Sequence, residues 1–368
     1  MNIDKIKVAY IEGRPSSHPT HAKFAKSVNA EFHFVDFKMR WQDKNRSILY
    51  RVTSWLICAF TFPNRKKFNV FYVDNLHFMP VIMKILFLRK RKQKIVVHLG
   101  SHTLYFLYTH QFSKFNEYLH KQALRRYDAL ICEGKMAETL ARKILGDKTP
   151  KIYTVFNGIP TEHQPSEKWM CKKLNGKNIL LIANGQSGFR LWYKGLDLMI
   201  DAFDIAVKND PELTFTIVGA WEKSFTDKLL ENKSDKTKNA ISFPGPTKDL
   251  WKYTQDASLY LHCARGDAFP ITILIAMASG LPSIISEWTG TKEVIEQVAP
   301  VFIAPLDAKA IAEKINWYFE LPLSERELFS NKFRSIAKNY TEENVIENFK
   351  STFAQMIFDF HLHDKKTG

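Results

Sequence analysis

Short apolar runs recur along the chain in two successive series, separated by longer segments of mixed polarity. The first series occupies residues 7–12, 31–37, 69–73, 94–98, 129–132 and 151–156. The second occupies residues 178–183, 213–218, 240–243, 258–262, 283–286 and 301–303. Continuous short runs are typical of strands buried on both faces, and intervening helical segments favour parallel pairing. The pattern therefore predicts an α/β protein with two parallel sheets.

The domain organisation follows from the gap between the two series. Residues 161–177 are polar and read as a linker, and 368 residues exceed what one hydrophobic core usually serves. We expect two Rossmann-like domains facing an inter-domain cleft, at residues 1–160 and 161–340. Residues 341–368 are expected to form a helix that packs back on the N-terminal domain.

Cysteine usage and hydropathy indicate the compartment. Four cysteines are scattered along the chain and form no Cys-x-x-Cys pair, which indicates reduced thiols. The N-terminus shows no signal-peptide core. The apolar runs at 55–62 and 78–88 fall short of the roughly 20 residues that a membrane-spanning helix needs. We expect a cytoplasmic protein.

The charge lies almost entirely in the first part of the chain. Residues 1–160 hold 28 Lys and Arg against 11 Asp and Glu, a balance of +17, and the remainder balances at −2. The basic run 84–94 overlaps the end of the apolar run 78–88. The apolar run is either a core helix followed by a solvated basic turn, or the two runs together form a surface that docks on the anionic inner face of the cell membrane. No nucleic-acid motif accompanies it, so we predict no nucleic-acid partner.

The segment 259–294 carries the clearest chemistry. A buried strand is followed by Asp267, by a helix that opens at 269–272, and by Gly280 where the helix stops. The free N–H groups at a helix start, together with the helix dipole, favour a phosphate group. The segment thus predicts a phosphate-binding helix start with an acidic residue beside it.

The same residues resemble the nucleotide-sugar signature of glycosyltransferase family 4, which has Glu-Gly-Phe-Pro/Gly, four variable residues, and then Glu-Ala-Met-Ala-x-Gly. Here the frame runs Asp-Ala-Phe-Pro and then Ile-Ala-Met-Ala-Ser-Gly, from Asp267 to Gly280. Four further segments resemble family motifs in the right order, at 155–159, 193–197, 215–219 and 241–245. The resemblance covers roughly residues 150–300.

The resemblance implies the GT-B fold and a retaining glycosyltransferase of the hexosyltransferase type. Such an enzyme moves a sugar from a UDP- or GDP-linked donor to a cell-envelope polysaccharide, a lipopolysaccharide or a lipid-linked acceptor. Two alternatives remain open from the residues. One is a degenerate, non-catalytic GT-B scaffold or binding protein, and the other is a GT-B nucleotide-sugar epimerase or hydrolase.

The resemblance also implies roles for individual side chains. Lys194 and Arg190 clamp the donor diphosphate, Asp267 lies near the transferred sugar, and His98 faces that sugar from the end of a buried strand. Ile275 stands where the family has a Glu that holds the ribose diol, and it cannot accept a hydrogen bond. Further donor contacts are expected at Gly13, Gly219, Pro244, Gly245, Phe269, Pro270, Ile271 and Thr272.

Metal dependence is not expected. The chain contains no Asp-x-Asp sequence, and a Lys/Arg clamp can neutralise the leaving diphosphate in place of a divalent ion. We therefore predict no metal and no cofactor beyond the donor substrate.

Overall fold

The fold was analysed in a computed structural model, which describes residues 6–12, 19–35, 47, 67–75, 78–85, 90, 92–164, 170–186 and 188–366. The chain divides into two compact units. The first comprises residues 1–156 and 345–368, and the second comprises residues 157–344.

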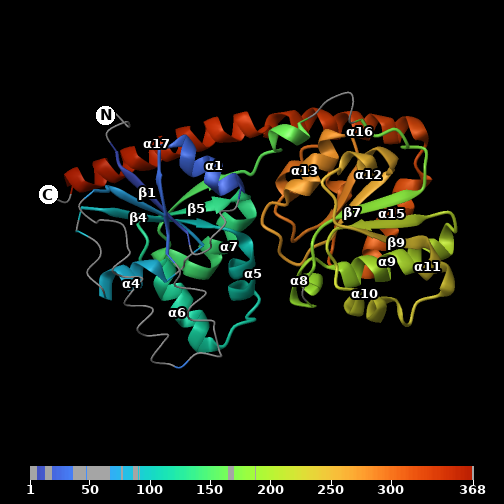
Figure 1. The fold of residues 1–368 in the computed structure, drawn as a ribbon, viewed down its shortest axis with the longest axis horizontal. Helices are drawn as coiled ribbons and strands as arrows, with labels where there is room; N and C mark the ends of the chain where they lie inside the picture. Colours follow the sequence, from blue (N-terminus) through green and yellow to red (C-terminus); the bar gives the residue numbers. More distant parts are fainter. Residues whose placement is uncertain are drawn as a thin grey trace. The chain divides into compact units, whose positions relative to one another are not determined.

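The first unit contains a parallel six-stranded sheet in the order β2-β1-β3-β4-β5-β6. Strands β1, β4 and β5 of this sheet are labelled in Figure 1. Its strands are β1 (Val8–Glu12), β2 (Glu31–Phe34), β3 (Val70–Asp74), β4 (Lys94–Leu99), β5 (Ala129–Glu133) and β6 (Lys151–Val155). Its helices are α1 (Pro19–Ser27), α4 (Met79–Ile85), α5 (Ser101–Tyr108), α6 (Lys114–Leu124), α7 (Gly134–Leu145) and α17 (Glu342–Lys366). The strand order reverses between β1 and β3.

The second unit contains another parallel six-stranded sheet, in the order β12-β11-β10-β7-β8-β9. Its strands are β7 (Asn178–Ile182), β8 (Thr214–Val218), β9 (Ile241–Gly245), β10 (Leu259–His262), β11 (Ser283–Ser286) and β12 (Ile303–Ala304). Its helices are α8 (Gly188–Tyr193), α9 (Leu196–Asn209), α10 (Lys223–Leu230), α11 (Asp235–Ala240), α12 (Trp251–Asp256), α13 (Ile271–Ala278), α14 (Lys292–Ile295), α15 (Ala308–Glu320) and α16 (Leu323–Ala337). Counted from β7, the order is 3-2-1-4-5-6, which is the doubly wound order of dinucleotide-binding folds.

These elements confirm the α/β prediction, because each predicted apolar run holds one strand of one of the two sheets. The run 301–303 differs most from its prediction. It begins as a 3₁₀ turn at Pro300–Phe302, and only Ile303 and Ala304 pair with β11. A proline that opens a turn has a fixed φ and no N–H to donate to a ladder, so the strand starts after it. The run 55–62 lies outside the described residues.

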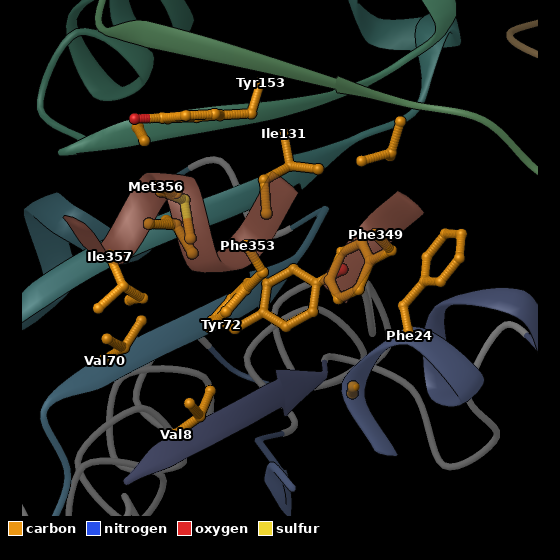
Figure 2. Close-up of a cluster of buried hydrophobic side chains, with 14 of the residues drawn as sticks. Val8, Phe24, Val70, Tyr72, Ile131, Tyr153, Phe349, Phe353, Met356 and Ile357 are labelled. Atoms are coloured by element: carbon orange, nitrogen blue, oxygen red, sulfur yellow. The ribbon is translucent and has the colours of Figure 1, made fainter. Parts of the chain in front are cut away.

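The core of the first unit includes the C-terminal helix α17, although this helix lies far from the sheet in sequence. Phe349 stacks on Phe24 of α1 with ring centroids 4.5 Å apart, and the ring centroids of Phe353 and Tyr72 of β3 lie 6.2 Å apart. Figure 2 shows these rings side by side between the strands and the helix. Met356 is also fully buried in this cluster. One face of α17 therefore completes the core of the N-terminal sheet.

None of the described helices combines the length and the apolar character needed to cross a lipid bilayer.

Truncating the α17 core contact should destabilise the protein. We expect Phe349→Ala to lower the free energy of unfolding by about 3–5 kcal/mol, because it removes a buried ring and leaves a cavity. The control is Phe358→Ala on the same helix, where the side chain is 52% exposed and the expected change is within about 0.5 kcal/mol. Denaturant unfolding followed by circular dichroism measures both, and equal effects would contradict this packing role.

Candidate functional site

The strand order of the second unit predicts a ligand site at the carboxyl ends of β7 and β10. Ligands of open parallel sheets bind outside the carboxyl ends of the strands, at the point where the strand order reverses. In the second unit this reversal lies between β7 and β10. The segment 183–195 follows β7 and the segment 263–270 follows β10, so both reach this edge.

Lys194 and Asp267 form an ion pair at this edge, between Nζ and Oδ2. His262, the last residue of β10, places Nε2 at 3.1 Å from the same carboxylate oxygen. The Lys194 and Asp267 side chains are 13% and 15% exposed, and His262 is buried. The structure thus joins two of the predicted site residues and adds one that the sequence did not single out.

The charges of this group follow from its surroundings. Burial would raise the pKa of the Asp267 carboxyl, but the Lys194 ammonium and the His262 hydrogen bond hold it well below its usual range. Burial lowers the pKa of His262, and Lys194 lowers it further against the opposing effect of Asp267. At neutral pH the group is therefore an ammonium, a carboxylate and a neutral imidazole that donates through Nε2.

Tight backbone contacts hold the two loops together. Gly195 has φ +72°, and a Cβ atom there would lie 2.0 Å from the carbonyl oxygen of Cys263. Arg265 forms a bidentate pair with Asp197, with both N–O distances at 2.7 Å. The Tyr193 hydroxyl donates to the carbonyl oxygen of Gly266. Only glycine permits this approach, so the Lys194–Asp267 geometry is fixed by the backbone.

Helix α13 begins at this edge, and its first turn corrects one sequence prediction. Pro270 is the N-cap residue, and proline has no N–H group, so it cannot donate to a phosphate as predicted. The N–H groups of Ile271 and Thr272 lie in the first turn of the helix, where no helical carbonyl four residues earlier can accept from them. They therefore remain available. The carbonyl oxygen of Phe269 accepts a hydrogen bond from Asn157 Nδ2, at 3.3 Å. Ile275 is buried one turn further along.

The other predicted donor contacts occupy the same edge at β8 and β9. Gly219 has φ +134°, and a Cβ atom there would lie 1.8 Å from the carbonyl oxygen of Ala183. Its N–H donates to the carbonyl oxygen of Gly245 at 3.0 Å, which brings the ends of β8 and β9 together; Pro244 lies within β9. Arg190, on α8, donates from Nε to the carbonyl oxygen of Asn184 at 3.4 Å, and its side chain is exposed.

In the first unit, His98 belongs to a buried cluster at the carboxyl edge of that sheet. Its Nδ1 lies 2.6 Å from the Tyr72 hydroxyl, and its Nε2 lies 3.2 Å from Glu133 Oε1. His21 stacks on it with ring centroids 4.0 Å apart, and contacts Glu133 Oε1 at 2.5 Å and Asp74 Oδ1 at 3.0 Å. His98 has no exposed surface in this arrangement, and its contact with a sugar stays a prediction.

The cluster contains opposite charges in a buried setting. Burial would lower the pKa of His21, but Glu133 and Asp74 together raise it to about 10. Burial would raise the pKa of Glu133, yet His21 holds it well below its usual range. Burial lowers the pKa of His98, and the neighbouring His21 lowers it further. A cationic His21 thus lies between two carboxylates, beside a neutral His98.

Three of these side chains bring potential metal-ligand atoms close together. Potential ligand atoms of His21, His98 and Glu133 lie within 4.8 Å of one another, among the side chains that the structure describes. In this arrangement both ring nitrogens of His21 face carboxylate oxygens, so no lone pair of that ring is left for a metal. Metal independence itself stays a prediction.

The sequence prediction missed five members of these groups, namely His21, Tyr72, Asp74, Glu133 and His262. A signal was present for four of them, because Asp74, Glu133 and His262 are polar residues at the ends of apolar runs and His21 lies in the helix after the first run. Parallel strands bring such ends to one edge. Gly13 lies outside the described residues.

Comparisons with known proteins relate the chain to glycosyltransferases. Residues 178–320 match the family model of glycosyl transferases group 1. An uncharacterized glycosyltransferase of Haemophilus influenzae is 27% identical over 62% of this chain and 64% of its own length. The chain thus spans slightly less than two thirds of that relative.

Two further similarities extend over most of the chain. The N,N'-diacetylbacillosaminyl-diphospho-undecaprenol alpha-1,3-N-acetylgalactosaminyltransferase of Campylobacter jejuni is 21% identical over 91% of this chain and 80% of its own length. The solved structure of Anabaena Alr3699/HepE in complex with UDP and glucose has a TM-score of 0.71 at 16% identity, over 95% of this chain and 100% of that one.

These findings confirm the GT-B fold, with two units that each contain a parallel sheet, and support a GT-B glycosyltransferase. The match to the family model lies within the second unit, where the Lys194–Asp267 pair is found.

Proposed function

We propose that the chain is a retaining, metal-independent glycosyltransferase of family 4 that takes a hexosyl group from a UDP- or GDP-linked donor. The observation that carries this proposal is the Lys194–Asp267 ion pair at the reversal between β7 and β10, beside the start of α13. A cation, a carboxylate and free backbone N–H groups are the groups needed to bind a diphosphate and a sugar at one place.

The chemistry of transfer requires stabilisation of a leaving diphosphate. Lys194 would exchange part of its contact with Asp267 for the phosphate oxygens, and thereby neutralise the charge that develops in the transition state. Arg190 is the second cation on the same side of β7 and would add a bidentate contact. Asp267 stays ionised over the working range, so it accepts hydrogen bonds from sugar hydroxyls and does not act as an acid.

The proposed acceptor is a cell-envelope glycan, a lipopolysaccharide or a lipid-linked sugar. The Campylobacter relative, whose similarity extends over most of the chain, is named for a diphospho-undecaprenol acceptor. For the present chain this supports a lipid-linked acceptor class.

Removal of the Lys194 cation tests the proposal. We expect Lys194→Ala to reduce donor turnover by at least about 10²-fold, mainly in kcat, because the lost interaction strengthens in the transition state. The matched control is Lys208→Ala in α9, whose side chain is 62% exposed and should leave turnover unchanged. Wild-type kinetics for Lys194→Ala would exclude this site.

A second test concerns the metal. If wild-type turnover is lost after treatment with EDTA and restored only by a divalent ion, the metal-free mechanism is excluded.

A substitution at Ile275 tests how the protein holds the ribose of the donor. By the family resemblance, Ile275→Glu should restore a carboxylate toward the ribose diol and tighten nucleotide binding by about 1–3 kcal/mol, roughly 5- to 150-fold. Calorimetric titration with UDP and GDP measures the change, with Ile275→Gln as the uncharged control. Equal or weaker binding by Ile275→Glu would mean that other groups hold the ribose.

We also propose that the first unit docks on an anionic membrane surface. Helix α6 exposes Phe115 (69%), Tyr118 (59%) and Leu119 (36%), which share one helical face because they are spaced three and four residues apart. The exposed Lys114 lies on the same helix. Exposed aromatic side chains in a strongly basic region suit insertion among acidic headgroups.

Vesicle sedimentation tests this docking. Replacing Phe115 and Tyr118 together with Ser should weaken binding to vesicles containing phosphatidylglycerol by at least about 10-fold, since two exposed rings no longer enter the interface. Binding of the wild type should also fade between 0.1 M and 1 M salt, where the Debye length falls from about 10 Å to 3 Å. Phe358→Ser, a comparably exposed ring on α17, serves as the control. A wild type that fails to co-sediment at low salt would contradict the proposal.

A further inference from the structure

His21 holds a chemically unusual position, because both of its ring nitrogens face carboxylates. Nδ1 lies 3.0 Å from Asp74 Oδ1, and Nε2 lies 2.5 Å from Glu133 Oε1. A neutral imidazole has one N–H and one lone pair, so it would direct a lone pair at one of these oxygens and be repelled. Only the doubly protonated ring donates to both. The contacts therefore assign His21 as a buried imidazolium.

His98 lies directly against this cation. The two rings stack with centroids 4.0 Å apart and an interplanar angle of 27°. A second imidazolium at this separation would face like-charge repulsion in a setting with little solvent to screen it. His98 is therefore the neutral member of the stacked pair.

The neighbours of His98 determine where its one proton lies. The Tyr72 hydroxyl, 2.6 Å from Nδ1, is protonated because burial raises the pKa of this phenol, so it can donate to Nδ1. The remaining ring nitrogen, Nε2, then carries the proton and lies 3.2 Å from the ionised Glu133. Nε2 is buried and makes no aligned hydrogen bond among the described residues.

We propose that His21 and Glu133 are positioning residues that hold His98 in the neutral form with its proton on Nε2. The stacked imidazolium excludes a second positive charge, and the carboxylate shared by both rings attracts the Nε2 proton. The proposal rests on the proposed function for its catalytic meaning, since the family resemblance places His98 toward the transferred sugar. A fixed Nε2–H would then be a donor of constant charge and direction.

The titratable groups around His98 shift its pKa in opposite directions. The titratable groups that face it, among the described residues, come from α1 (His21), β3 (Tyr72 and Asp74) and the end of β5 (Glu133). Burial and His21 lower the pKa of His98, whereas Glu133 and Asp74 oppose them. Loss of the His21 charge should therefore raise the pKa of His98.

Nitrogen-15 NMR of the histidine-labelled full chain tests the assignment without reference to activity. The chain has 12 histidines, and loss of signals in His21→Gln and His98→Gln identifies the two rings. In the wild type, we expect His21 to keep both nitrogens protonated from pH 6 to 8.5, and His98 to keep only Nε2 protonated. An ordinary titration of His21 near pH 6.5, or a proton on Nδ1 of His98, would overturn the proposal.

Three substitutions in α1 separate charge from packing. His21→Gln removes the cation and should raise the pKa of His98, so that His98 becomes protonated at a higher pH than in the wild type. His21→Lys keeps a positive charge and should keep His98 neutral. Lys26→Gln removes an exposed cation from the same helix and should change nothing. Identical His98 titrations in the Gln and Lys variants would assign His21 a packing role only. If a variant does not fold, the wild-type spectrum alone decides the protonation of His21 and His98.

The pH profile of donor turnover connects the network to function. In His21→Gln, kcat should fall by roughly 10-fold between pH 8 and pH 6 relative to wild type, with little change in the KM for the donor, and His21→Lys should restore the wild-type profile. A wild-type profile in His21→Gln would overturn the positioning role. If the wild type itself turns over no nucleotide sugar, the proposed function fails, while the NMR result still decides the protonation of His98.

Discussion

Parallel strand pairing is the constraint on which the described sites depend. Within each sheet, the backbone N–H and C=O groups hydrogen-bond to one another between buried strands. Polar side chains are therefore concentrated where the strands end. All carboxyl ends lie at one edge, and residues far apart in sequence therefore meet there. Lys194 and Asp267 are separated by 73 positions, and His21 and Glu133 by 112, yet both pairs are in contact.

Burial of charge at these edges is tolerated because each charge has a close partner. An isolated buried carboxylate would cost several kcal/mol in lost hydration, and an ion pair with further hydrogen bonds offsets that cost. In the second unit, Asp267 receives both Lys194 and His262. In the first unit, Glu133 receives His21 and also precedes helix α7 as its N-cap residue, where the helix dipole favours a negative charge.

The two sheets differ in strand order, and in each unit one charged pair lies beside the point where the order reverses. The second sheet reverses between its first and fourth strands, and the loops carrying Lys194 and Asp267 flank that reversal. The first sheet reverses between β1 and β3, where Asp74 ends β3 and pairs with His21. The fold alone does not assign an activity, because many chemistries share it. The functional argument therefore rests on these side chains.

The amino-acid sequence by itself determined the strands and their class of packing. Runs such as 94–98 and 178–183 are continuously apolar, and an element buried on both faces leaves this signal locally. It also located the Lys194 and Asp267 segments, because glycines and a helix start are local features with a direct chemical meaning. Pro270 was misassigned as a phosphate contact through its N–H, although its identity as a proline was already sufficient to exclude that role.

The tertiary structure alone decided which side chains share a site. His262 and Glu133 lie in apolar stretches that read as ordinary strand ends, and His21 lies in a helix with no motif around it. Their contacts depend on strand order and register, which join Asp74 to His98 across neighbouring strands and bring α1 against them. Charge and protonation depend on these distances, because Coulomb interactions and desolvation act through space. The sequence therefore specified the elements and the candidate chemistry, and the three-dimensional packing specified the partners and their charge.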